Sequence, residues 1–290
     1  MIGLVLVTYA HWPEKLLASV DAAGLDVIWS IHHHGSDPDF TARVAKLAER
    51  PRTRLHLHCE NRGLSRSWNE GVHEVLAAGA THAMLVNDDL HFVAGGFSAF
   101  VDFARAHDPL SVAFLQGLET GGSPYAGQVM QQGFACCTLT PAVIERVGWF
   151  DQNIIPAYYE DYDYYRRCVL SGVAFVTAPD VLAEHERSKT TRDNPEIRIG
   201  HEEIMKHNLE YYTRKWGAPG AETFERPFGD PDWTNHIAWE GRADPYAPKA
   251  PPAAQADEEV GAVQEEPRRF WPALRHRLTA LTDRYGLRRP

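Results

Sequence analysis

The chain has 290 residues and a formal net charge of −10, and 44% of its residues are hydrophobic. This length allows one large core, with or without a tail, and the acidic balance argues against a general nucleic-acid binder. The 4 cysteines form no C-x-x-C pair, so they indicate neither zinc nor a disulfide framework. Reduced thiols, with no signal peptide and no long apolar stretch, predict a cytoplasmic location that could include peripheral contact with the inner membrane face.

Predicted strands and helices alternate along the first part of the chain. The apolar run 2–7 is typical of a strand buried on both faces. A helix opens at Pro13, further strands are predicted at 26–32, 53–58 and 83–86, and helices at 38–49 and 65–78 lie between them. This alternation predicts a parallel sheet with helices on both faces, in which ligands bind beyond the carboxyl ends of the strands.

The first two strand ends carry aromatic and imidazole side chains. Tyr9 could stack on a nucleotide base or be a half-buried aromatic residue. The second strand ends in His32, His33 and His34. Consecutive side chains on a strand point to opposite faces, so these three histidines cannot all bind one metal ion.

The third and fourth strand ends carry charged residues. The segment 61–71 contains glycines that let a ligand approach the backbone, and it opens a helix whose N-terminus suits phosphate. Arg62 and Arg66 add positive charge for a diphosphate, although a polar loop capping the helix through Ser65 would look similar. After the fourth strand, Asp88 and Asp89 offer oxygen ligands for Mg²⁺ or Mn²⁺, or else form a turn with Asx hydrogen bonds.

The rest of the chain up to residue 216 continues the mixture of strands and helices. Helices are predicted at 95–107, 141–147 and 197–216, strands at 110–115, 129–139 and 173–177, and a mobile glycine-rich loop at 117–127.

A further segment, 147–172, begins with a Gly-Trp-Phe-Asp turn and an aromatic loop. It then enters a helix at Glu160 and Asp161, which Gly172 ends. A carboxylate in a first helical turn tends to stay ionised, and in a pocket it can take a proton from an attacking hydroxyl. Ordinary helix capping is the alternative explanation.

Taken together, these motifs resemble the family-2 glycosyltransferases. The second signature of that family reads approximately G-hydrophobic-F-D-E, an aromatic pair, E-D-x-D, an Arg and a closing Gly. The matching residues here are Gly148, Phe150, Asp151, Tyr158, Tyr159, Glu160, Asp161, Asp163, Arg166 and Gly172, and Gln152 stands where the family commonly has Glu. The resemblance implies a GT-A-type, Rossmann-like α/β fold with a mixed, mostly parallel sheet. It also implies inverting, Mn²⁺- or Mg²⁺-dependent transfer from a nucleotide-diphosphate sugar to an acceptor hydroxyl.

The resemblance also implies a role for each candidate residue. Asp161 would deprotonate the acceptor hydroxyl, and Asp89 and His185 would hold the metal. The donor-binding residues would be Tyr9, His33, Asp37, Arg62, Arg66, Asn69, Asn87 and Asp88, and the acceptor-binding residues Trp149, Tyr158, Tyr159 and Glu160. His33 replaces the Asp with which the family reads the nucleotide base, so an altered base preference is expected.

Two other functions are compatible with a layered α/β sheet. A sugar-nucleotide pyrophosphorylase would need a glycine-rich, basic loop directly after the first strand, and the residues 9–12 do not provide one. A non-catalytic sugar- or nucleotide-binding module would not need both acidic motifs. The acceptor cannot be read from the sequence, so glycan, lipid, protein and modified nucleic acid all stay open.

The C-terminal part has a different composition. We expect the glycosyltransferase domain at 1–215, an extension packed on it at 216–244, and a Pro/Ala/Glu-rich linker at 245–266. Residues 267–290 read as a basic amphipathic helix. This helix could dock on a partner protein, an anionic membrane surface or the core, or could be solvated without a partner.

Overall fold

The computed structural model describes residues 1–35, 37–122, 125–186 and 195–222. The strands are β1 (Ile2–Thr8), β2 (Val27–His34), β3 (Thr53–His58), β4 (His82–Asn87), β5 (Leu90–Phe92), β6 (Ser111–Glu119), β7 (Val129–Met130), β8 (Cys136–Leu139), β9 (Ala174–His185), β10 (Gly217–Ala218) and β11 (Ala221–Glu222). The helices are α1 (Glu14–Asp21), α2 (Pro38–Ala45), the 3-10 helix η1 (Lys46–Glu49), α3 (Leu64–Ala77), α4 (Gly96–Arg105), α5 (Pro141–Val147), α6 (Glu160–Leu170) and α8 (Pro195–Trp216).

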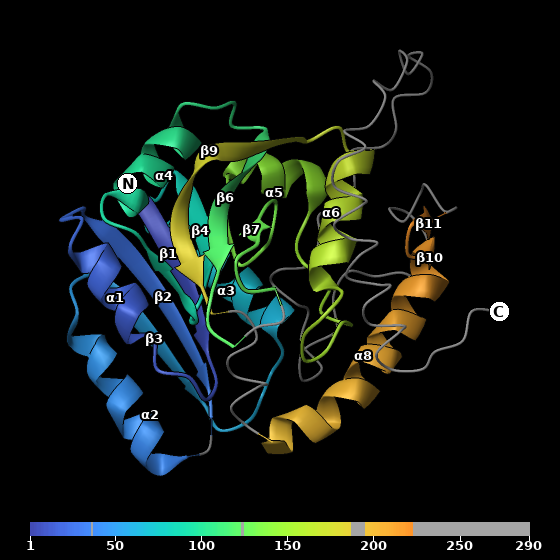
Figure 1. Ribbon diagram of the computed structural model, residues 1–290, viewed down its shortest axis with the longest axis horizontal. Helices are drawn as coiled ribbons and strands as arrows, with labels where there is room; N and C mark the ends of the chain where they lie inside the picture. The colour runs from blue at the N-terminus through green and yellow to red at the C-terminus, as the bar shows by residue number, and fades with distance from the viewer. Residues whose placement is uncertain (36, 123–124, 187–194, 223–290) are drawn as a thin grey trace.

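Within these described residues, the main sheet has nine strands in the order β3-β2-β1-β4-β8-β6-β9-β5, with β7 paired to β6 (Figure 1). Strands β3, β2, β1 and β4 are parallel, so their carboxyl ends lie at one edge of the sheet. Beyond β4 the sheet is mixed, because β8 is antiparallel to both β4 and β6, whereas β9 is parallel to β6. The predicted α/β class with a mixed, mostly parallel sheet is confirmed.

Helices cover both faces of the sheet, and β1 shows how the sequence requires this. Leu4 and Leu6 point into a core formed with α1, α2 and α4, whereas Val5 points into a second core formed with α3, α5 and α6. The alternation of side chains along a strand makes a continuous apolar run necessary when both faces are covered. Helix α3 packs closely, because a Cβ atom at Gly71 would lie 2.4 Å from Cγ1 of Val5.

Helix α8 packs against α6 through apolar and ionic contacts. Tyr212 and Trp216 are buried with Tyr159 in a third cluster. The side chain of Lys215 is fully buried and contacts carboxylates of Asp151 and Asp163. Packing of the core therefore continues through the end of α8.

Several predicted boundaries differ from the structure. Strand β6 continues through Glu119 into the predicted glycine-rich loop, and β9 is longer than the predicted strand 173–177. The predicted helix 38–49 is divided into α2 and η1, and the strand material at 129–139 is divided into β7 and β8. The expected linker and basic helix, and most of the extension at 216–244, lie outside the described residues. Among the described residues, none of the helices is long and apolar enough to cross a bilayer.

Candidate functional site

The candidate site lies at the carboxyl edge of the sheet, where backbone pairing brings three distant segments together. Asp88 and Asp89 form the turn between β4 and β5. His185 ends β9 and is paired in register with Leu90 of β5 and with Glu119 of β6. The main-chain N–H of Glu186 donates to the carbonyl oxygen of Asp89 at 2.9 Å. The acidic turn and His185 are therefore held side by side, as their expected common role requires.

His185 lies between two buried carboxylates. Its Nε2 is 3.1 Å from Oδ1 of Asp89, and its Nδ1 is 3.4 Å from Oε2 of Glu119. Burial lowers the pKa of His185, but the two carboxylates outweigh it and raise this pKa to about 9. Burial and the charge of Asp89 raise the pKa of Asp88 well above its usual value.

Such a group of carboxylates and one imidazole offers the donor types that Mn²⁺ accepts. Asp89 and Nε2 of His185 converge and could hold an ion together. Glu119 faces the other ring nitrogen, which is the position from which a carboxylate orients a metal-binding imidazole. Glu119 was missed by the sequence reasoning because it lies in the segment predicted to be a mobile loop.

The loop that precedes α6, residues 148–159, is hydrogen-bonded to the first turns of α3. The side-chain amide of Asn69 donates to the carbonyl of Phe150 at 2.9 Å and accepts from its N–H at 2.9 Å. The N–H of Leu64 donates to the carbonyl of Pro156 at 2.7 Å. Asn69, a predicted donor-binding residue, therefore uses its amide to place the 61–71 segment beside the loop that leads to Asp161.

Two consecutive aromatic residues in that loop have left-handed backbones. Tyr158 has φ of 77° and Tyr159 has φ of 76°, a conformation that costs a bulky residue of the order of 1–3 kcal/mol. The side-chain amide of Asn208 on α8 donates to the carbonyls of Ala157 and Tyr158 at 2.8 and 3.2 Å, which helps to hold the turn. Tyr159 is buried in the third cluster, whereas the ring of Tyr158 lies against His201.

Glu160 and Asp161 open helix α6 directly after this turn. Glu160 is buried, and burial together with the charge of Asp161 raises the pKa of Glu160 to about 8. Glu160 therefore holds a proton at neutral pH for most of the time. Asp161 is only partly buried, and its Oδ1 accepts from the N–H of Tyr162 at 2.9 Å. Asp161 is therefore the more exposed carboxyl group of the pair.

The residues predicted to read the base surround the end of β2. Tyr9 is 40% exposed, as a stacking surface requires. His33 is fully buried, with Nδ1 3.1 Å from Oγ1 of Thr8 and Nε2 3.2 Å from Oγ1 of Thr41. Asp37 caps α2 by accepting from the N–H of Phe40. Both ring nitrogens of His33 thus already have partners within the protein.

The other predicted residues are placed as follows. Arg62 and Arg66 both contact Oε1 of Glu70, at 3.0 and 3.2 Å. Asn87 is partly buried at the end of β4. Trp149 is partly buried, and its ring centroid is 6.2 Å from that of His73. Glu70 therefore holds both arginines that were expected to meet a diphosphate.

Comparison with solved structures shows which class of fold this is. The chain is similar to mannosyltransferase PcManGT from Pyrobaculum calidifontis in complex with GDP-Man and Mn²⁺, with a TM-score of 0.50 and 14% identity. The match covers 76% of this chain and 66% of that one, so this chain spans slightly less than two thirds of its length. It is also similar to residues 1–349 of S. aureus TarS in complex with UDP, with a TM-score of 0.51, 11% identity and coverage of 73% and 72%.

At 14% and 11% sequence identity, the similarity to these two structures shows only that this chain has the same fold as they do. No family model and no curated protein matches the chain. What the protein does must therefore be argued from the residues of the site.

Proposed function

We propose that this protein is an inverting, metal-dependent glycosyltransferase of the family-2 type, which uses a nucleotide-diphosphate sugar. The observation that carries the proposal is the group formed by Asp89, His185 and Glu119 at the strand ends. It is supported by the pair Glu160–Asp161 at the start of α6, because α6 and β9 run in opposite directions in Figure 1, so that α6 begins toward the side of the sheet where β9 ends. The likeness to a fold that holds GDP-Man and Mn²⁺ in another protein agrees with both observations.

In the proposed reaction Asp161 removes the proton from the acceptor hydroxyl as its oxygen attacks the anomeric carbon. The bond between that carbon and the diphosphate oxygen breaks, and the configuration inverts. Glu160 is protonated near neutral pH and so adds no negative charge beside the base. Trp149 and Tyr158 would shape the acceptor pocket, and the buried Tyr159 would support it.

Arg62 and Arg66 would stabilise the diphosphate as it leaves, after exchanging their contact with Glu70 for the phosphate oxygens. Asp89 and His185 would hold Mn²⁺ or Mg²⁺, with Glu119 orienting the imidazole, and Asp88 would contact the ribose. Such an ion would neutralise negative charge that develops on the leaving diphosphate.

A nucleotide panel tests this proposal most directly. Thermal shifts with UDP, GDP, dTDP, CDP and ADP, each with Mn²⁺, should show stabilisation by at least one nucleotide, because a ligand that binds the folded state raises Tm. Position 33 can read the base only when its side chain exchanges the contacts with Thr8 and Thr41 for the nucleotide; in that case His33→Asp, which restores the acceptor of the family, should change which nucleotide stabilises most. Stabilisation by none of the five, with the protein folded and metal-loaded, would count against the glycosyltransferase proposal.

A further inference from the structure

A cluster of histidines and glutamates lies apart from the Asp89–His185 group. Strands β2 and β3 are parallel, and their register pairs His32 with His56 and His34 with His58. Because side chains alternate along a strand, all four rings lie on the face of the sheet that α3 covers. The rings of His32, His56 and His58 are stacked, with centroids 4.5 Å apart for His32 and His56 and 5.6 Å apart for His32 and His58.

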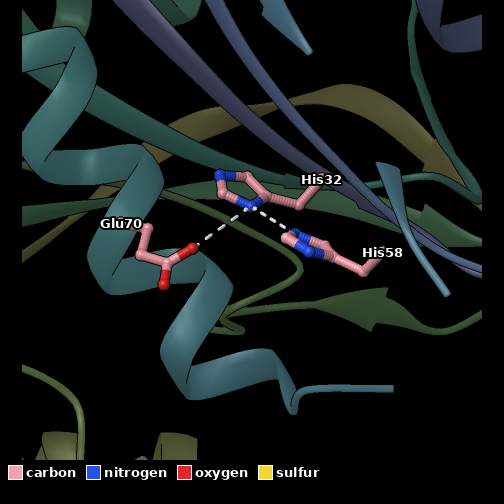
Figure 2. A group of neighbouring side chains, drawn as sticks. All are labelled: His32, His58 and Glu70. Carbon is pink, nitrogen blue, oxygen red and sulfur yellow. Dashed lines mark hydrogen bonds and ion pairs between the residues drawn. The ribbon is translucent and has the colours of Figure 1, made fainter. Parts of the chain in front are cut away.

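Three side chains of this cluster converge on one point. Nδ1 of His32 lies 3.4 Å from Nε2 of His58 and 3.8 Å from Oε2 of Glu70 (Figure 2). Two ligand atoms that bind one tetrahedral zinc ion at about 2.0–2.1 Å are about 3.3–3.4 Å apart. The two imidazoles already have this separation, the Glu70 oxygen lies a few tenths of an ångström beyond it from His32, and all three ligand atoms lie within 4.8 Å of one another.

The surroundings of His32 suit a metal ligand. Its Nε2 is 3.1 Å from Oγ of Ser30, and this hydroxyl donates to Oε2 of Glu74 at 2.6 Å. With an ion on Nδ1, the ring proton of neutral His32 lies on Nε2, from which it donates to Ser30. A metal-binding imidazole is commonly oriented in this way by a hydrogen bond at its other nitrogen.

The nearby arginines compete with an ion at this point. Arg62 and Arg66 make their shorter contacts to Oε1 of Glu70, whereas Oε2 faces His32 and accepts a longer hydrogen bond, of 3.5 Å, from Nη1 of Arg62. Nη1 of Arg62 also lies 3.2 Å from Nδ1 of His58. An ion on Nε2 of His58 would place the ring proton on Nδ1, so Arg62 would have to turn away.

We propose that His32, His58 and Glu70 form a binding site for one divalent transition-metal ion, of which Zn²⁺ fits best. Two imidazoles and one carboxylate are a ligand set that zinc accepts, with a fourth position left for water. His32 and Glu70 are buried while His58 is partly exposed, so the ion has a route from solvent. The ion would join β2, β3 and α3.

This site is distinct from the one at the acidic turn. Strand β4, which leads to Asp89, is separated from β2 by β1, and from β3 by β1 and β2, which corresponds to about 9 Å and about 14 Å at the usual strand spacing. A second grouping, His32 with His56 and Glu74, shares one ligand with the proposed site. In that grouping His56 already contacts Glu74 at 2.8 Å, and Nε2 of His32 faces Ser30. His56 therefore provides a matched control.

The test uses the full-length chain without a histidine tag, stripped of metal and titrated with Zn²⁺ against a chromophoric chelator. We expect His58→Ala and Glu70→Gln to weaken one binding event by more than about 100-fold, since loss of even an outer partner costs 10–100-fold. His56→Ala should change it by only a few fold, and Asp89→Ala should leave it in place. Arg62→Gln should strengthen it, because the competing cation is gone.

Two results would overturn the assignment. One is that the wild type binds Zn²⁺ tightly but Asp89→Ala loses all of this binding. The other is that His56→Ala loses the binding whereas His58→Ala retains it. Substitution with Co²⁺ adds a measurement on the wild-type protein that does not depend on the folding of variants. The visible absorption of a four-coordinate ion is expected, and a purely six-coordinate spectrum would also contradict the proposed site.

Discussion

Replacing Lys215 with methionine should destabilise the protein more than any change at an exposed position of α8. Nζ of Lys215 lies 2.7 Å from Oδ2 of Asp151 and 2.7 Å from Oδ1 of Asp163, and all three side chains are buried. Lys215→Met retains most of the side-chain volume and removes the positive charge. The buried carboxylates of Asp151 and Asp163 would then lose the ammonium group that both of them contact.

Breaking a buried ion pair by removing one partner typically costs about 3–5 kcal/mol. The lower end applies here, because Asp163 keeps its contact with Arg167 and Asp151 keeps the hydroxyl of Tyr211. For a domain of this size 1 kcal/mol shifts Tm by about 2–4 °C, so Tm should fall by about 6–12 °C. Urea unfolding and thermal melting at neutral pH measure both quantities.

The pH dependence gives a second readout of the same cluster. Burial raises the pKa of Asp163, but Arg167 and Lys215 outweigh it and lower this pKa to about 2. A carboxylate with a depressed pKa in the folded state stabilises it above the ordinary value near 4, and this contribution is lost between about pH 4 and about pH 2. In Lys215→Met the decline in stability should begin at a higher pH.

The matched control is Lys206→Met, an exposed lysine on the same helix. This variant should stay within about 0.5 kcal/mol of the wild type. If Lys215→Met unfolds with the same free energy as Lys206→Met, the buried cluster does not stabilise the packing of α8, and the reasoning is wrong.

Three further predictions concern the proposed reaction and the tail. Asp161→Asn keeps the shape of the side chain and removes its basicity, so sugar transfer should fall by about 10²–10⁴-fold while donor affinity barely changes; turnover at the wild-type rate would exclude Asp161 as the base. Chelation should abolish turnover, and Mn²⁺ or Mg²⁺ should restore it. Asp89→Ala and His185→Ala should each weaken metal-dependent donor binding. Glu119→Gln should weaken the same binding by about 10–100-fold, because Glu119 orients the imidazole of His185. Full activity in excess chelator would remove the ion from the mechanism. Truncation after about Asp244 should leave Tm unchanged, because the linker at 245–266 has few apolar residues to bury and the basic helix is expected to act in location or partner choice; a large drop would show that the tail is part of the core.

The parallel half of the sheet could be predicted from the sequence because each of its strands has a strong local pattern. Strand β1 is apolar from Ile2 to Val7 since both of its faces are covered. Strands β5, β7, β10 and β11 are only two or three residues long, too short to produce a recognisable alternation. Strand β9 is partly or fully exposed along much of its length and contains Pro179 and Asp180 near its middle, so only its first residues resembled a strand.

The candidate site could be predicted only where its residues belong to a local motif. Asp88, Asp89, Glu160 and Asp161 each lie in such a motif, and β-strand pairing places His185 beside Asp89. Glu119 could not be found in this way, because its relation to His185 depends on the register of β6 against β9.

The histidines of β2 illustrate the same limit. The alternation of side chains correctly separates His33, which contacts Thr8 and Thr41, from its neighbours. That argument concerned one strand alone, however, whereas the partners of His32 come from β3 and α3. Sequence reasoning about consecutive histidines therefore could not detect a site assembled from three elements.

Glu70 links the proposed donor site to the proposed zinc site. Its Oε1 holds Arg62 and Arg66, and its Oε2 faces His32. A diphosphate that draws the arginines away would leave Glu70 and His58 more available to Zn²⁺, and bound Zn²⁺ would in turn release the arginines for phosphate. Coupling between binding sites is reciprocal, so each ligand should tighten the binding of the other by the same factor.

This coupling can be measured by titrating Zn²⁺ with and without a saturating nucleoside diphosphate that the thermal-shift panel has identified. A factor of about 5 or more is expected, which lies at the lower end of typical couplings. Arg62→Gln should reduce the coupling, because the arginine that exchanges between Glu70 and phosphate is lost while the proposed Zn²⁺ ligands remain. Tight but independent binding of both ligands would show that the arginines do not exchange between Glu70 and phosphate, even if both sites exist.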